Sequence, residues 1–290
     1  MSTIVHDKCK PRGDGCVIEL AGQSGLPYQG RRVARAAGEM LGLTAKSVSF
    51  DESTKPGWLS GILRGLNRSN GSGKRSNESG KPKGHLEFIT HCAGAIALED
   101  LVGLPKDQRE RITVNIIAGP RRRNMFKFML GVCRDEFVAR NIRRKGLLGK
   151  LATRLSGAGK KSGDVEAKSA KSRDALRRLR EDAVAEDPES AKVKSPFRQL
   201  LKLGEVLRTE RVDLAESLKN AGIKTRLAFM AGDRYFPTDK KELRRAKRKG
   251  IPTVVLQGTH NDLIRDPMDV LNRFFKKIEK IEKIRKNNKD

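Results

Sequence analysis

Cys92 has the sequence surroundings of a reactive thiol. It follows a short, largely apolar run, and an Ala-rich helical pattern begins directly after it. A nucleophile on the tight bend between a strand and a helix needs small neighbours, because the backbone there is strained. The N-terminal end of the following helix favours negative charge and would therefore stabilise a thiolate. This pattern predicts a cysteine nucleophile for acyl transfer.

Two further titratable groups stand on Gly-containing turns after later apolar runs. Asp233 follows the run 224–232, and His260 follows the run 253–258. The carboxyl ends of parallel strands meet at one edge of an open α/β sheet, where ligands bind. We therefore expect Cys92, Asp233 and His260 to converge at this edge, in that chain order, as nucleophile, acid and histidine.

The elements that must position these residues alternate between apolar strands and amphipathic helices. Strands are predicted at residues 16–20, 46–51, 86–91, 112–118, 224–232 and 253–258. Helices are predicted after the Cys92 turn and at residues 30–41, 58–66, 240–249 and 267–284. This alternation predicts the α/β class, with a mostly parallel, doubly wound sheet covered on both faces.

The composition changes in the middle of the chain. Between residues 121 and 220 no strand is predicted, and short helical pieces alternate with basic runs and a polar stretch. We expect an inserted helical, basic module over 121–220. The two parts of the α/β core are then expected at 1–120 and 221–290.

The turns Ala-Gly-Asp at 231–233 and Gly-Thr-His at 258–260 follow the Cys92 bend in register, and together they resemble the α/β-hydrolase family. The resemblance covers nearly the whole chain and includes an inserted helical cap. It implies that Cys92 is the nucleophile and that His260 is its base and later acid. It also implies that Asp233 orients His260.

The resemblance also implies an oxyanion hole, formed by the backbone N–H of Ala93 and one from the turn at Gly22 or Gln23. The sequence departs from the family pattern at two positions. Thr90 stands where the elbow usually has Gly, and the nucleophile is Cys instead of Ser. A cysteine at this place is similar to dienelactone hydrolases and to the lipase-like box of polyhydroxyalkanoate synthases.

Each of these residues also has a structural interpretation. Cys92 could be a small buried hydrophobic residue, His260 a loop histidine and Asp233 a helix cap. Asp262 and Asp266 are rival acids, but they follow the histidine and suit caps of the last helix.

Two other residues near the predicted turns compete for a role. His91 stands beside the thiol and could tune it, although the position before a nucleophile usually points elsewhere. Ser24 also follows a strand and is a rival nucleophile. Leu26 occupies the place where an elbow requires Gly, and this turn comes too early for the family order, so its Gly-rich backbone suits the oxyanion loop better.

No cofactor and no metal ion are expected. No His, Cys or carboxylate cluster has ligand spacing, and the stretch 22–30 lacks both phosphate-loop patterns. The four cysteines form no Cys-x-x-Cys pair, no secretory leader precedes them, and no apolar run could span a bilayer. These features predict a cytoplasmic protein.

The net charge of +27 and the pI of about 10.3 predict nonspecific binding to polyanions at low salt. No signature of specific nucleic-acid recognition accompanies the basic runs. We predict a hydrolase that cleaves ester, lactone or thioester bonds of a small acyl substrate, for which the basic insertion suggests an anionic group. Two alternatives stay open, namely an acyltransferase on the same triad and a catalytically silent hydrolase-like binding protein with polyanion affinity.

Overall fold

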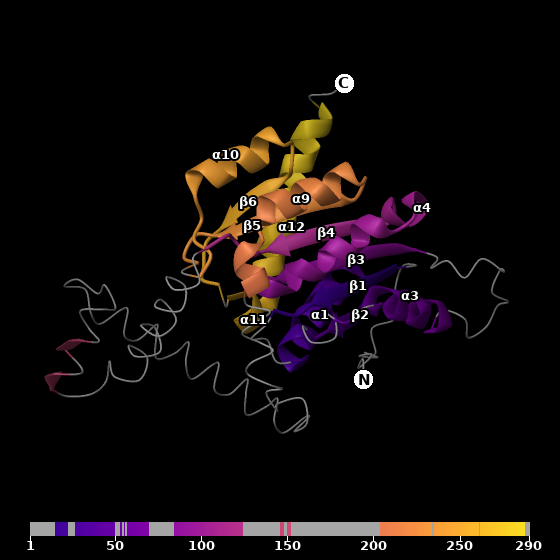
Figure 1. Cartoon of the computed structure of the whole chain (residues 1–290), viewed down its shortest axis with the longest axis horizontal. Coiled ribbons are helices and arrows are strands. Elements are labelled where there is room, and N and C mark those ends of the chain that lie inside the picture. Colours follow the sequence, from indigo (N-terminus) through magenta and orange to yellow (C-terminus); the bar gives the residue numbers. More distant parts are fainter. Residues whose placement is uncertain are drawn as a thin grey trace.

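One parallel sheet organises the protein. The computed structural model describes residues 15–22, 27–49, 53, 55, 57–69, 84–123, 146–147, 150–151, 204–233, 235–260 and 262–287. Within these ranges, six parallel strands form a sheet in the order β2-β1-β3-β4-β5-β6 (Figure 1). They are β1 (Gly15–Leu20), β2 (Thr44–Val48), β3 (His85–His91), β4 (Ile112–Ile117), β5 (Lys224–Met230) and β6 (Thr253–Leu256).

Helices cover both faces of this sheet, because the strands alternate apolar side chains between their two faces. One face packs against α1 (Pro27–Leu41), α11 (Asp262–Arg265) and α12 (Pro267–Asn287). The other packs against α3 (Trp58–Ser69), η1 (Cys92–Gly103), α9 (Arg211–Asn220) and α10 (Lys240–Arg248), while α4 (Lys106–Arg109) connects η1 to β4. The predicted α/β class with a parallel, doubly wound sheet is confirmed.

The element bounds differ from the expected ones by a few residues. Helix α1 starts at Pro27, ahead of the expected residue 30, and the fixed φ of proline suits a first helical position. Strand β2 occupies Thr44–Val48 instead of 46–51, and η1 is wound as a 3₁₀ helix. None of the helices in the described ranges is both long and apolar enough to cross a bilayer.

Helix α9 lies inside the span 121–220 that was expected to form the insertion. Its side chains Val212, Ala215 and Leu218 are buried, and they join the hydrophobic core on β4 and β5. This helix is therefore part of the cover of the sheet. Most of the rest of the span lies outside the described residues, so the helical module itself stays a prediction.

The two flanks of that span are joined by backbone hydrogen bonds. The N–H of Arg123 donates to the Leu207 carbonyl at 3.0 Å, and the N–H of Arg211 donates to the Pro120 carbonyl at 3.0 Å. The chain therefore returns to the core beside the point where it left β4.

Candidate active site

The bend between β3 and η1 holds Cys92 in an uncommon backbone conformation. Its φ is +56°, in the left-handed region that residues other than glycine seldom occupy and that costs about 1–2 kcal/mol. Gly94 shows why the residues beside Cys92 must be small. A Cβ on Gly94 would collide with the carbonyl oxygen of Leu20 and would lie 2.8 Å from the carbonyl oxygen of Ala21. Such local strain is typical of functional sites.

The turn after β1 runs directly alongside this bend. A Cβ on Gly22 would lie 3.0 Å from the Cβ of Cys92 and 3.1 Å from the carbonyl oxygen of His91. The backbones of Gly22 and of the buried Ala93 thus both lie next to the thiol. Gln23 and Ser24 lie outside the described residues, and the oxyanion hole stays a prediction.

The Asp233 carboxylate binds the imidazole of His260 after β5 and β6. The Nδ1 of His260 donates to Oδ2 of Asp233 at 2.8 Å, while Oδ1 accepts the backbone N–H groups of Tyr235 and Phe236 at 2.9 Å each. Burial would raise the pKa of Asp233, but the hydrogen bond and charge of His260 outweigh it and hold that pKa below its usual range.

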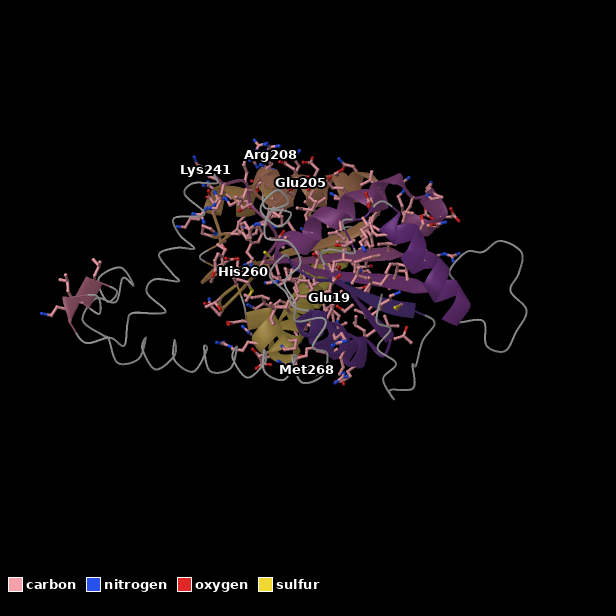
Figure 2. All side chains as sticks on the ribbon, turned by 60° about the horizontal axis from the view of Figure 1, so that its bottom comes forward. Glu19, Glu205, Arg208, Lys241, His260 and Met268 are labelled. Carbon is pink, nitrogen blue, oxygen red and sulfur yellow. The ribbon has the colours of Figure 1, made fainter. Side chains whose placement is uncertain are left out.

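The other side of the His260 ring faces the thiol. His260 is only 6% exposed and lies within the body of the molecule (Figure 2). Burial alone would lower its pKa, but the negative charge of a Cys92 thiolate, its hydrogen bond and the Asp233 carboxylate raise the pKa of His260 to about 10. The surroundings therefore favour the protonated form of the His260 ring. The structure brings these three side chains together, and their catalytic roles stay predictions.

His91 makes a contact that sequence reasoning did not anticipate. Its ring is buried, and Nε2 donates to the backbone carbonyl of His260 at 2.7 Å, across 169 residues of sequence. Burial, followed by the nearby charge of His260, lowers the pKa of His91 to about 3, so the ring is neutral. No local pattern could have revealed this partner.

The rival acids have other partners. Asp262 accepts hydrogen bonds from the Thr259 N–H at 2.9 Å and from the Thr259 hydroxyl at 2.7 Å. Asp266 accepts the backbone N–H of Asp269 at 3.2 Å, at the start of α12. Asp266 therefore caps the last helix, as expected, whereas Asp262 begins α11 and holds the turn at Thr259 instead. In the part of the chain that is described, no group of three or more His, Cys, Asp or Glu side chains could hold a metal ion.

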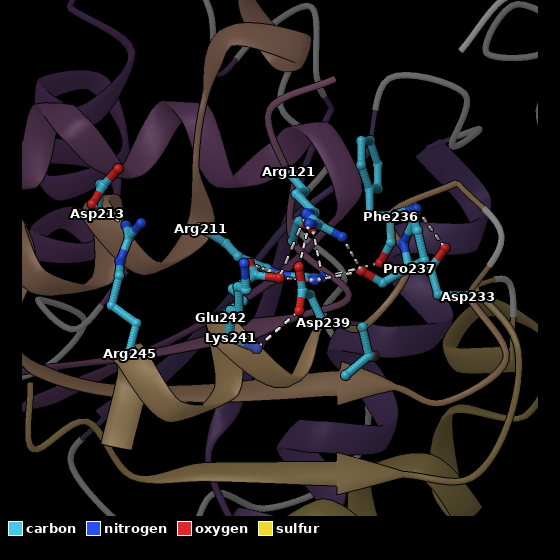
Figure 3. Close-up of polar contacts among 12 residues, drawn as sticks. Arg121, Arg211, Asp213, Asp233, Phe236, Pro237, Asp239, Lys241, Glu242 and Arg245 are labelled. Carbon is cyan, nitrogen blue, oxygen red and sulfur yellow. Dashed lines mark hydrogen bonds and ion pairs between the residues drawn. The ribbon is translucent and has the colours of Figure 1, made fainter. Parts of the chain in front are cut away.

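A buried arginine holds the loop that follows Asp233 (Figure 3). Arg211, on α9, is fully buried and forms a two-pronged ion pair with Glu242 at 2.7 and 2.8 Å. The same guanidinium donates to the carbonyls of Phe236 and Pro237 at 3.3 Å each. Because the Phe236 N–H binds Asp233, Arg211 supports the position of the acid.

Two arginines from the end of β4 bind the same loop. Arg121 donates to the Pro237 carbonyl at 3.0 Å and to Asp239 at 2.8 Å. Arg123 donates to the carbonyl of Tyr235 at 2.7 Å. Part of the positive charge that composition assigns to solvated surface thus stabilises the candidate site.

No family model and no curated protein matches the chain. Among solved structures, it is similar to Rv0554 from Mycobacterium tuberculosis, with a TM-score of 0.54 and 12% identity over 93% of this chain and 92% of that chain. A thermophilic esterase from Thermogutta terrifontis matches at a TM-score of 0.47 and 15% identity, over 92% of this chain and 90% of that one. An alpha/beta hydrolase enzyme from a Medee basin deep-sea metagenome library matches at a TM-score of 0.46 and 11% identity, over 90% of this chain and 87% of that one.

Identities this low concern the fold and not the activity. The likeness to Rv0554 shows that the two chains share a fold. The parallel sheet, with a strained bend directly after β3, is the architecture that the family resemblance implies. The chain has the α/β-hydrolase fold.

Proposed function

We propose that this protein is a hydrolase that cleaves ester, lactone or thioester bonds, with Cys92 as nucleophile, His260 as base and acid, and Asp233 as the orienting carboxylate. One observation carries the proposal most strongly. The Asp233 carboxylate holds the His260 imidazole at 2.8 Å, and the Cys92 side chain lies within interaction distance of that ring, each residue following the carboxyl end of a strand, β5, β6 and β3 respectively. A nucleophile held by a base, which is itself oriented by a third group, is the arrangement that activates acyl transfer.

The reaction would proceed in two displacements. The Cys92 thiolate attacks the carbonyl carbon, and the electron pair of the C=O bond moves to oxygen. The tetrahedral intermediate then expels the alcohol or thiol, which takes the proton from the imidazolium of His260, and a thioester of Cys92 is formed. His260 next removes a proton from water, the hydroxide attacks the thioester, and the acid leaves as the thiolate and imidazolium return.

Backbone N–H groups of Ala93 and of the turn at Gly22 or Gln23 would stabilise the charge on the tetrahedral oxygen. Donors of this kind are worth ~10²–10³ in rate, and they are usually the largest single contribution to catalysis. The position of Gly22 against Cys92 supports this assignment, because a larger residue there would push the turn away from the thiol.

The surroundings of Cys92 support an apolar acyl group. The thiol packs against a small cluster made by Ala93, Val206, Leu207 and Phe236, with Ile96 and Tyr235 at its border. An anionic group elsewhere on the substrate stays a proposal from the charge of the chain.

Intact-mass analysis with p-nitrophenyl esters and acyl thioesters tests the proposal. The wild type is expected to gain the mass of one acyl group, which Cys92→Ala abolishes and His260→Ala slows. Cys16→Ala is the matched control, because Cys16 is a free but buried cysteine on β1 and should leave the adduct unchanged.

The fate of the adduct separates the alternatives. Release of the free acid supports a hydrolase, whereas transfer to an added alcohol or amine in preference to water supports an acyltransferase. A folded wild type that forms no adduct with any donor refutes the proposal and favours the silent binding protein.

A further inference from the structure

His91 lies beside the nucleophile, yet the chemistry above gives it no task. It is the last residue of β3, its ring is 4% exposed, and it hydrogen-bonds to the backbone of His260. We infer that His91 is a positioning residue, which holds the His260 imidazole at the thiol by donating its Nε2–H to the His260 carbonyl. The inference rests on the proposed function for its catalytic meaning.

The sheet topology explains why such a link is needed. Strands β4 and β5 lie between β3 and β6, so no ladder hydrogen bonds join the turn of Cys92 to the turn of His260. His91 spans this gap with a 2.7 Å hydrogen bond. The two imidazole rings also pack against each other, with centroids 4.5 Å apart and planes inclined by 45°. His91 therefore contacts both the backbone and the ring of His260, and so fixes the position of His260 relative to β3, the strand that precedes the nucleophile.

A neutral donor is required at this place. A charged ring at position 91 would lie against the His260 imidazolium and would oppose it. Burial keeps His91 uncharged, and its pKa is lowered to about 3. With Nε2 carrying the hydrogen, Nδ1 is unprotonated and faces the Gly22 turn, where a Cβ would approach it to 3.6 Å. The ring is thus wedged between the predicted oxyanion turn and the base.

Three substitutions separate the donor from the shape of the ring. His91→Gln retains an N–H donor of similar reach, His91→Asn retains the amide on a shorter side chain, and His91→Phe retains the flat ring without a donor. His85→Phe is the matched control, because this histidine begins the same strand and its side chain is 46% exposed. Circular dichroism and thermal unfolding establish that each variant is folded.

The readout is the rate at which iodoacetamide alkylates Cys92 at pH 6–8, measured by peptide mass, together with kcat and KM on an activated ester. A displacement of about 1 Å near the reacting atoms can cost ~10²-fold in rate. We expect His91→Phe and His91→Asn to lower alkylation and kcat between ~10- and ~100-fold with little change in KM, and His91→Gln to stay within about threefold of wild type.

Equal alkylation rates in wild type, His91→Asn and His91→Gln overturn the inference. An equal fall of the alkylation rate in all three variants, His91→Phe, His91→Asn and His91→Gln, overturns it as well. If His91→Phe does not fold, the comparison of Asn with Gln decides. Alkylation requires no acyl substrate. A wild type that is alkylated rapidly near neutral pH but hydrolyses no donor therefore refutes the proposed function, while the series still tests the positioning role.

Discussion

A buried carboxyl group beneath α1 should make the stability of this protein strongly dependent on pH. Glu19 lies on β1 and is 3% exposed, and its Oε2 accepts a hydrogen bond from the Ser47 hydroxyl at 2.8 Å. Burial raises the pKa of Glu19 from 4.5 to about 8, and the hydrogen bond from Ser47 offsets only part of that rise. Glu19→Gln retains the shape and a partner for Ser47 but carries no charge at any pH.

The expected size of the effect follows from proton linkage. Below pH 4.5 the folded and unfolded chains are both protonated at Glu19, so the group costs nothing through ionisation. Between pH 4.5 and about 8 only the unfolded chain loses the proton, and folding stability falls as pH rises. At ~1.4 kcal/mol for each tenfold change in proton affinity, the full loss is about 5 kcal/mol. Above pH 8 both states are ionised and the loss is complete.

Urea unfolding of wild type and Glu19→Gln measures this loss, with the fluorescence of Trp58 as probe. Trp58 is the single tryptophan of the chain and is 6% exposed on α3. We expect the variant to be more stable than the wild type by about 1 kcal/mol near pH 5 and by about 4 kcal/mol near pH 8. Glu110→Gln is the control, because that side chain is 59% exposed and lies on the surface. A stability difference that is the same at both pH values would refute the reasoning.

Three other perturbations test the site and the charge. Asp233→Asn is expected to slow acylation ~10³–10⁴-fold in stopped-flow assays, because the amide favours the wrong tautomer of His260; a loss below tenfold contradicts the orienting role. Arg211→Met should lower the free energy of unfolding by about 3–5 kcal/mol, since it removes both close hydrogen bonds of the buried Glu242 and leaves, among the described cations, only Arg121, at 3.8 Å. The double variant with Glu242→Leu should recover most of this loss, and unchanged stability would refute the estimate. Retention on heparin should fall steeply with salt because the net charge is +27, and salt-independent retention would argue for a different contact.

The turns of the candidate site could be predicted because their signals are local. Each of β3, β5 and β6 is an apolar run of strand length, followed at once by small residues or by a turn containing glycine. In a parallel sheet the carboxyl ends of such strands share one edge, so convergence of Cys92, Asp233 and His260 followed from the fold class. Periodicity does not specify helix ends, and α1 accordingly begins three residues early.

The supporting contacts could not be predicted, because they depend on distant packing. His91 binds a carbonyl 169 residues away, and nothing in its neighbourhood indicates that partner. Arg211 stands in a stretch of mixed charge, between Glu210 and Asp213, where nothing local marks it as buried. Only the packing of α9 against α10 buries its guanidinium against Glu242. Charge counted along a sequence does not distinguish a solvated arginine from a buried one.

The two backbone hydrogen bonds that join Arg123 to Leu207 and Arg211 to Pro120 have a consequence for how this protein can evolve. Because the chain leaves and re-enters the core at one point, the intervening segment closes a loop whose entropic cost rises by only about 0.6 kcal/mol for each doubling of its length. Natural variation can lengthen, shorten or exchange that segment without disturbing the strands. Arg121, Arg123 and Arg211, which lie where the chain leaves and re-enters the core, also bind the loop that follows Asp233. These contacts lie on the core side of that crossing, so a change in the length of the segment leaves the loop after Asp233 in place.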